Sequence, residues 1–165
     1  MTETFLADEE LRALALKAGN VFAQAGHCIV TAESCTGGGI MKTLTDIPGS
    51  SQWCEGGFIT YTNRAKHHFL GVPEVLFEQV GAVSEEVVRA MASGALAHSA
   101  GTLSVAVSGV AGPGGGSPEK PVGTVWIAWA KNDGVVTKCF LFSGERDAVR
   151  RQTVDAAIRG LMALC

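Results

Sequence analysis

The sequence predicts an α/β fold in which a mixed sheet is covered by helices on both faces. Short apolar runs rich in β-branched residues alternate along the chain with segments of helical periodicity, and no linker divides them. The last two expected strands are joined by a tight turn, which places an antiparallel pair in the sheet. Because 165 residues can bury one full core, we expect one three-layer α/β/α domain over residues 1–165.

Composition and charge exclude several classes of protein. With 47% hydrophobic and 18% charged residues, the chain is globular rather than disordered, and a net charge of −3 gives no support for a nucleic-acid-binding surface. The five cysteines include no C-x-x-C pair, so free thiols are expected rather than disulfides or a zinc site. The N-terminus has no signal-peptide pattern and no apolar run is long enough to span a bilayer, so we expect a soluble cytoplasmic protein.

The first half of the chain predicts a helix, a strand–turn–helix unit and a second strand. Asp8 to Ala25 has the pattern of an amphipathic helix, with a cap near Thr4 or Asp8. Cys28–Gly39 begins as a β-branched strand and ends in three glycines, and the helix after it ends before Pro48. Trp53–Tyr61 is expected to be a strand whose central glycine pair marks a bulge or a close backbone approach.

The second half predicts three helices, three strands and a glycine-rich loop. A polar turn and a short basic cluster, residues 62–68, precede a short helix that ends at Gly81. The helix from Ser84 to about His98 carries small residues that suit close packing on a sheet or on a second subunit. The remaining expected elements are a strand at Leu103–Val107, a glycine-rich loop at Ser108–Gly116, a hairpin of Val122–Lys131 and Val135–Phe142 across Asn132-Asp133-Gly134, and a helix from about Glu145 to Leu164.

The turn after the first strand is the first candidate for chemistry. It carries a hydroxyl, a thiol and a second hydroxyl on Ser34, Cys35 and Thr36, where side chains leave the end of the sheet. The backbone N–H groups that start the next helix are unpaired at such a point and can hold an anion or stabilise developing negative charge. The alternative is that Ser34 or Thr36 serves only as a helix N-cap. The local sequence leaves both readings open.

Three candidate segments follow predicted strands and should meet at one edge of the sheet: the Ser34 turn, the stretch from Tyr61 to Lys66, and the loop that begins at Ser108. A serine needs a base to become a useful nucleophile, and neither His27 nor His98 is an obvious partner. Lys66 can serve instead if burial lowers its pKa. Tyr61 could relay the proton or hold Lys66 in place.

Each of these residues also has a simpler interpretation. A lysine after a turn is usually a solvated charge, and Tyr61 at a strand end is more often a packed ring with its hydroxyl in water. Cys35 is an alternative nucleophile, but no histidine is clearly placed to activate it, which favours a structural thiol. The loop 112–116 lacks the Walker A pattern; it could present N–H groups to a phosphate or act as a flexible connector.

Five short motifs cover nearly the whole chain in a consistent order. They are TAESCTGG (Thr31–Gly38), Tyr61-Thr62-Asn63 with Lys66 five residues past the tyrosine, LGV (Leu70–Val72), SGVAGPGGG (Ser108–Gly116) and KPVGTVWIA (Lys120–Ala128). Together they resemble the CinA C-terminal domain family, the nicotinamide mononucleotide deamidases also called PncC. The resemblance implies an amidohydrolase that converts nicotinamide mononucleotide to nicotinate mononucleotide and ammonia in pyridine-nucleotide recycling. It also implies a mixed, mostly parallel five-stranded sheet, and neither metal nor cofactor.

The resemblance also assigns roles by position. The nucleophile falls on Ser34, the lysine base on Lys66 and the assisting tyrosine on Tyr61. Thr62 stands where the family often has serine, and Ser108 stands where a threonine is common, which keeps the hydroxyl. Amides near Thr36–Gly38 would stabilise the oxyanion, while the loop 112–116 and an arginine would hold the 5′-phosphate and ribose. The expected substrate-binding residues are Thr36, Gly37, Gly38, Ser108, Gly112, Gly114, Gly115, Arg146 and Arg150, with no firm choice between the two arginines.

Other functions are compatible with the same residues. A non-catalytic nucleotide-binding or regulatory module would use the anion-holding turn and loop, and an esterase or peptidase could use Ser34. The longer CinA proteins carry an extra N-terminal domain that resembles molybdopterin-binding proteins, so a stand-alone deamidase is expected here. The expected partner is a small-molecule nucleotide, with no nucleic acid and no membrane. A homodimer through the small-residue helix is one option, although packing on the sheet explains that helix equally well.

Overall fold

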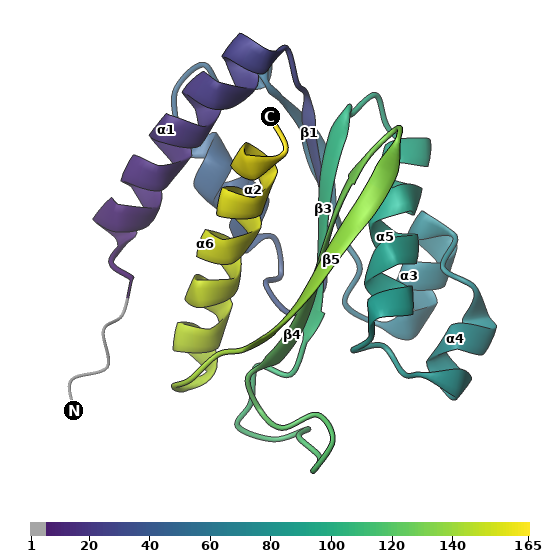
Figure 1. The fold of residues 1–165 in the computed structure, drawn as a ribbon. Coiled ribbons are helices and arrows are strands. Elements are labelled where there is room, and N and C mark those ends of the chain that lie inside the picture. Colours follow the sequence, from purple (N-terminus) through teal and green to yellow (C-terminus); the bar gives the residue numbers. More distant parts are fainter. Residues whose placement is uncertain (1–5) are drawn as a thin grey trace.

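A computed structural model describes residues 6–165 and contains a five-stranded sheet with helices on both faces (Figure 1). The strand order is β2-β1-β3-β4-β5. The strands are β1 (Ile29–Glu33), β2 (Cys54–Ile59), β3 (Leu103–Gly109), β4 (Thr124–Lys131) and β5 (Gly134–Leu141). The predicted α/β/α class is confirmed.

The sheet divides into a parallel half and an antiparallel half. β1 pairs in parallel with β2 and with β3, whereas β4 pairs antiparallel with both β3 and β5. No helix lies between β3 and β4, and a two-residue turn joins β4 to β5, so neither connection returns the chain to the starting edge of the sheet. The expected parallel pairing is therefore confined to the β2-β1-β3 half. That half brings the carboxyl ends of three strands to one edge.

Helices cover the two faces of the sheet in two groups (Figure 1). One hydrophobic core joins the sheet to the helices on one face, and a second core joins it to those on the other. The first group is α1 (Asp8–Ala25), α2 (Gly39–Thr45) and α6 (Arg146–Ala163), and a 3₁₀ turn at Ser50–Gln52 lies against α2. The second group is α3 (Asn63–Leu70), α4 (Glu74–Gln79) and α5 (Glu85–Ala97). The N-cap residue of α1 is Ala7, so Asp8 is the first residue of the helix. Thr4, the other expected cap, lies outside the described residues.

A polar turn is expected at Thr62-Asn63, and the basic cluster after it is assigned no element; in the structure Asn63 and the cluster lie inside α3. The hydroxyl of Thr62 accepts the N–H of Ala65 at 3.0 Å and caps the helix start. Gly71, with φ of 71°, ends the helix in the left-handed region. No helix is expected here from the sequence, because the segment is only eight residues long and mostly polar. This correction matters, because the helix turns Lys66 inward.

The glycine pair of β2 behaves as expected. The register of β1 against β2 shifts between Ile29 and Val30, so the pairing passes over one residue just before Gly56. A Cβ at Gly57 would collide with the hydroxyl of Thr31 on the neighbouring strand. The pair therefore supplies both a bulge and a close backbone approach.

The small residues of α5 pack within the chain. Ala92 and Ala95 are fully buried in the core that α5 forms with the sheet. Gly94 faces α3, and a Cβ there would collide with the main-chain carbonyl of Leu70. Intramolecular packing therefore accounts for the small-residue pattern of this helix.

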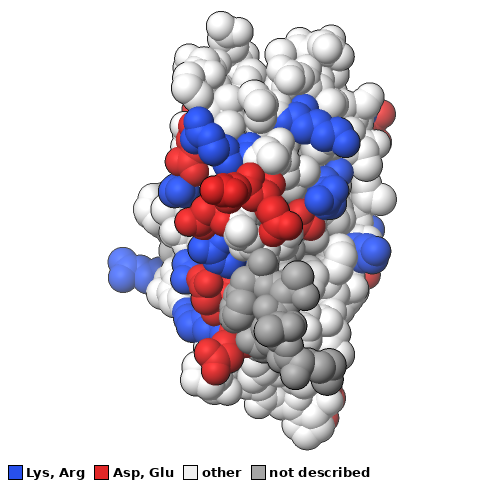
Figure 2. All heavy atoms as spheres, turned by 90° about the vertical axis from the view of Figure 1, so that its left-hand side faces the viewer, with Lys and Arg blue, Asp and Glu red and all other residues white. Residues whose placement is uncertain are grey.

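The surface over α1 and α6 mixes charges of both signs (Figure 2). Arg151 pairs with Asp8 at 2.7 Å and with Asp147 at 2.9 Å, and Arg159 pairs with Asp155 at 3.0 Å. Positive and negative side chains are therefore interspersed among the described residues of this face. None of the helices within residues 6–165 is long and apolar enough to cross a membrane.

The contact between Gly94 and α3 predicts a stability change. In Gly94→Ala the added methyl group must displace the end of α3, and we expect the free energy of unfolding to fall by about 2 kcal/mol in urea denaturation. Gly134→Ala is the matched control, because no atom lies within 4 Å of a Cβ built there. Equal stability of the two variants would contradict the close packing of α5 on α3.

Candidate active site

Residues from three strand ends line one cavity of about 230 Å³, here called the Ser34 cavity. Ser34 follows β1 directly, Tyr61 follows β2, and Ser108 lies near the end of β3. The carboxyl ends of adjacent parallel strands share an edge of the sheet, which is where ligands bind in open α/β sheets. The three segments predicted to converge are thus brought together.

The centre of the cavity is a contact between an amine and a hydroxyl. Lys66 Nζ donates to Ser34 Oγ at 2.9 Å and to the main-chain oxygen of Tyr61 at 3.2 Å. The Lys66 side chain is only 1% exposed. Burial lowers the pKa of Lys66 to about 8, because the charged form loses its hydration. A substantial fraction of the amine is therefore neutral near physiological pH and can accept a proton from the serine.

The main chain around Ser34 is fixed by the sheet. The N–H of Ser34 donates to Val107 O at 3.1 Å, and the N–H of Thr60 donates to Glu33 O at 2.8 Å. The turn then closes with the N–H of Gly37 on Ser34 O at 3.1 Å. Gly37 and Gly38 have φ of 59° and 101°, a region that side chains disfavour, so the turn needs glycine at both positions. Ser34 therefore sits on a rigid turn between strands.

Glu33, which sequence reasoning missed, lies buried beneath this turn. Its carboxylate is fully inaccessible and accepts hydrogen bonds from the N–H groups of Ile40 and Met41 at the start of α2. The Thr36 hydroxyl also donates to it, at 2.6 Å. The only available signal was a charged residue at the end of an otherwise apolar strand.

These contacts test whether Ser34 or Thr36 caps the next helix and whether the start of that helix can hold an anion. The N-cap residue of α2 is Gly38, which has no side chain, and the first free N–H groups of the helix are bound by Glu33 instead. The Ser34 hydroxyl is engaged by Lys66 and the Thr36 hydroxyl by Glu33, so neither serves as the helix cap. The amides of Ile40 and Met41 are already occupied, so the start of α2 is closed to an external anion.

The two candidate arginines have different surroundings. Arg150 donates from Nε to Cys35 O and from Nη2 to Thr36 O, both at 3.1 Å, and so binds the carbonyl groups of the turn. Arg146 lines the Ser34 cavity. It donates to Gly112 O at 2.8 Å and to the Tyr61 hydroxyl at 3.0 Å.

Tyr61 contacts Lys66 differently from the arrangement expected. Its main-chain oxygen accepts from Lys66 Nζ, whereas its phenol is bound to Arg146. The side chain is 59% exposed. The phenol therefore belongs to the mouth of the cavity, and the backbone of Tyr61 holds the lysine.

The remaining expected residues divide between the cavity wall and the outer loop. Ser108, with 2% of its surface exposed, lines the cavity. Gly112 reaches the site through its carbonyl contact with Arg146, whereas Gly114 and Gly115 lie in the exposed part of the loop, outside the cavity wall. Asn63 also lines the cavity, and sequence reasoning gave it no role beyond its place in a motif.

Cys35 is a weak competitor for the role of nucleophile. Its side chain is 6% exposed, and burial raises the pKa of the thiol to about 12. The thiolate is the reactive form of cysteine, so this thiol stays protonated and unreactive at neutral pH.

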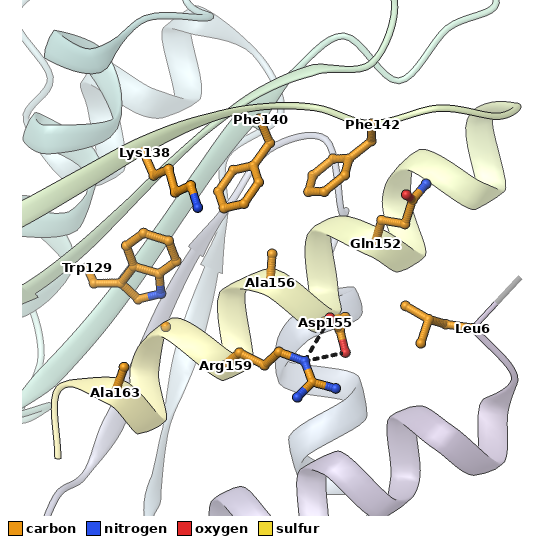
Figure 3. Close-up of a pocket in the computed structure, with 11 residues that line it drawn as sticks. Leu6, Trp129, Lys138, Phe140, Phe142, Gln152, Asp155, Ala156, Arg159 and Ala163 are labelled. Carbon is orange, nitrogen blue, oxygen red and sulfur yellow. Dashed lines mark hydrogen bonds and ion pairs between the residues drawn. The ribbon is translucent and has the colours of Figure 1, made fainter. Parts of the chain in front are cut away.

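A larger cavity of about 660 Å³ lies between β5 and α6 (Figure 3). The rings of Phe140 and Phe142 stack at 5.1 Å over it, and Asp155 and Arg159 pair with each other across its floor. It shares no lining residue with the Ser34 cavity and offers no hydroxyl or thiol nucleophile. Across residues 6–165, no group of three His, Cys, Asp or Glu side chains is arranged to hold a metal ion. The Ser34 cavity, which holds both a hydroxyl and an amine, is therefore the candidate for covalent chemistry.

Comparison with known proteins identifies the family of the chain. Residues 11–165 match the CinA C-terminal domain. Nicotinamide-nucleotide amidohydrolase PncC of Pseudomonas putida is 55% identical over 156 residues, covering 94% of this chain and 98% of that protein. The PncC of Escherichia coli strain K12 is 50% identical over 157 residues, covering 94% and 95%.

Solved structures show the same fold. The crystal structure of the competence/damage inducible protein CihA from Agrobacterium tumefaciens superposes with a TM-score of 0.92 at 42% identity, covering 99% of both chains. The competence damage-inducible protein A from Klebsiella pneumoniae gives 0.89 at 33% identity, covering 93% of this chain and 95% of that one. The chain therefore belongs to the CinA C-terminal domain family.

Proposed function

We propose that the protein hydrolyses the carboxamide of nicotinamide mononucleotide to give nicotinate mononucleotide and ammonia. The observation that carries the proposal is the buried Lys66 amine, 2.9 Å from the Ser34 hydroxyl. Relatives at 50–55% identity that are named nicotinamide-nucleotide amidohydrolase support the choice of substrate. A module that only bound nucleotides would have no use for a buried amine against a hydroxyl.

In the proposed mechanism the serine attacks and the lysine moves the proton. Neutral Lys66 takes the proton from Ser34 as Oγ bonds to the carboxamide carbon. The resulting ammonium returns the proton to the leaving nitrogen, the C–N bond breaks, and ammonia departs. Water then attacks the acyl ester with Lys66 again as base, which releases nicotinate mononucleotide and restores Ser34.

The oxyanion needs donors that the turn itself does not already use. The N–H groups of Gly37 and Gly39 close the turn on Ser34 O and Thr36 O. We assign one donor to the N–H of Cys35, which directly follows the nucleophile, the position that serves serine hydrolases with a strand–turn–helix nucleophile. The Ser108 hydroxyl, which also lines the cavity, supplies a second donor. Each is worth roughly 3 kcal/mol in the transition state.

The phosphate is assigned to Arg146. Its guanidinium lines the cavity and is held in place by Gly112 O and the Tyr61 phenol. Arginine matches phosphate geometry and keeps its charge at all working pH values. Arg150 is committed to the backbone of the turn and is not part of this assignment.

The paired roles of Ser34 and Lys66 predict a large loss of activity. We expect Ser34→Ala and Lys66→Ala each to lower kcat for ammonia release from nicotinamide mononucleotide by about 10³-fold or more. Ser143→Ala and Lys131→Ala are matched controls outside the Ser34 cavity and should keep wild-type turnover. Undiminished turnover in either cavity variant would refute its assigned role, and tight nucleotide binding without ammonia release by the wild type would favour a binding module.

The lowered pKa of Lys66 predicts the pH dependence of the reaction. The base acts only when neutral, so activity should rise with pH through about 8 and level off above it. The measurement is kcat/KM for ammonia release across roughly pH 7 to 10. A rate that is flat or falling over this range would contradict a lysine base.

The same burial predicts a cost in stability. The folded-state pKa of Lys66, about 8, lies below the ordinary lysine pKa of 10.5, so the protein loses stability where the amine must be charged and recovers it as pH rises from 8 to 10.5. We expect Lys66→Met to be more stable than the wild type near pH 7 by roughly 1–2 kcal/mol, after the lost hydrogen bonds are discounted. Urea denaturation should show this advantage shrinking toward pH 10; a constant difference would argue against a depressed pKa.

The assignment of Arg146 predicts a selective loss of binding. Arg146→Gln should raise KM for nicotinamide mononucleotide by about 10- to 100-fold, since a charge-assisted contact is lost. Nicotinamide riboside, which lacks the phosphate, should be hydrolysed with similar KM by wild type and variant. An equal change for both substrates would place the phosphate elsewhere.

A further inference from the structure

Glu33 is the last residue of β1 and is fully buried directly before the nucleophile. In the sheet it lies opposite Ile59 on β2 and Val107 on β3, so its main chain is fixed on both sides. Removing a carboxylate from water costs several kcal/mol unless its oxygens are well paired. The partners of this carboxylate therefore indicate what it stabilises.

Both carboxylate oxygens are fully used. One accepts from the Thr36 hydroxyl at 2.6 Å and from the Ile40 N–H at 2.9 Å. The other accepts from the Thr31 hydroxyl at 3.1 Å and from the Met41 N–H at 3.0 Å. Three of the four donors lie beyond Ser34 in the chain. The carboxylate thus ties the end of β1 to the start of α2 and closes the turn that carries Ser34.

A cation holds the opposite side of the same turn. Arg150 reaches from α6 and binds the carbonyl oxygens of Cys35 and Thr36. None of the ion pairs within residues 6–165 includes Glu33, so its charge is balanced by the amides and hydroxyls around it. Glu33 therefore binds the N–H groups that follow the turn, and Arg150 binds the carbonyl groups within it. Ser34 lies in the turn that these two charges hold.

A neutral amide could not replace this carboxylate. Four donors point at its two oxygens, and glutamine would turn an NH₂ group toward two of them. Aspartate is one methylene shorter and would withdraw from α2. Either change should move the turn, and a misplacement of about 1 Å can cost an enzyme about 100-fold in rate.

We propose that Glu33 is a positioning residue, which fixes the turn so that Ser34 Oγ faces Lys66 and the Cys35 N–H faces the oxyanion. By occupying the start of α2 it also directs the substrate phosphate away from that helix and toward Arg146. The proposal rests on the proposed hydrolysis at Ser34. It assigns to Glu33 no contact with the substrate.

The test compares Glu33→Gln and Glu33→Asp with Glu55→Gln in the full chain. Glu55 is an exposed carboxylate on the neighbouring strand β2, so it controls for the substitution itself. Three quantities are measured at a temperature where urea denaturation shows every variant to be folded. They are kcat and KM for ammonia release from nicotinamide mononucleotide, and the rate at which a fluorophosphonate probe labels Ser34, followed by intact mass.

We expect both Glu33 variants to lose about 100-fold in kcat with KM within about threefold of wild type. The labelling rate should fall in parallel, while Glu55→Gln matches the wild type. A residue with a purely structural role would lower stability and leave kcat and labelling unchanged in the folded variants. That result would overturn the proposal.

Two further measurements keep the test decisive. If the Glu33 variants do not fold, Thr36→Val removes only one of the four hydrogen bonds and should lower both kcat and labelling by about tenfold; wild-type values would overturn the proposal. If the wild type releases no ammonia, the proposed function fails. The labelling rate still reports the alignment of Ser34, so the two failures can be told apart.

Discussion

The structure depends on keeping one amine out of water beside one hydroxyl. Lys66 reaches Ser34 because α3 begins at the Thr62 cap, ends at Gly71 and packs closely on α5 at Gly94. Desolvation lowers the pKa of the amine, which converts an ordinary surface cation into a base. The proposed reactivity of the site therefore depends on how closely α3 packs, because a change that lets water reach Lys66 would favour its charged form.

The other charged side chains of the site lie apart from one another. Glu33 lies under the turn, Arg150 lies behind it, and Arg146 lies at the mouth of the cavity. This separation prevents the charges from cancelling one another, since each is bound to main-chain or hydroxyl groups. Arg146 is then the one guanidinium among the residues that line the cavity. The proposed substrate, with a neutral amide at one end and an anion at the other, would match this arrangement in one orientation.

Much of this arrangement could be predicted from the sequence, for identifiable reasons. β-branched runs followed by glycines marked the strand ends, and because parallel strands share their carboxyl edge, Ser34, Tyr61 and Ser108 could be placed together. The Asn132-Asp133-Gly134 turn marked the hairpin. Helix α3 was missed because it has only eight residues and most of them are polar. Arg146 and Arg150 are one helical turn apart, so only the structure separates them. Glu33 gave only the signal of a charge at the end of an apolar strand, because a sequence does not show where a carboxylate finds its donors.

Cys35 has a practical consequence for the design of covalent inhibitors. A thiol directly follows the proposed nucleophile in the chain, yet it is buried and held protonated, with its pKa raised to about 12. Haloacetamides and maleimides, which require a thiolate, would therefore leave the reaction centre intact and modify the exposed Cys139 and Cys165 instead. Phosphonate and sulfonyl electrophiles that react with activated alcohols are the suitable chemistry, and surface labels can be attached through the outer thiols without blocking turnover.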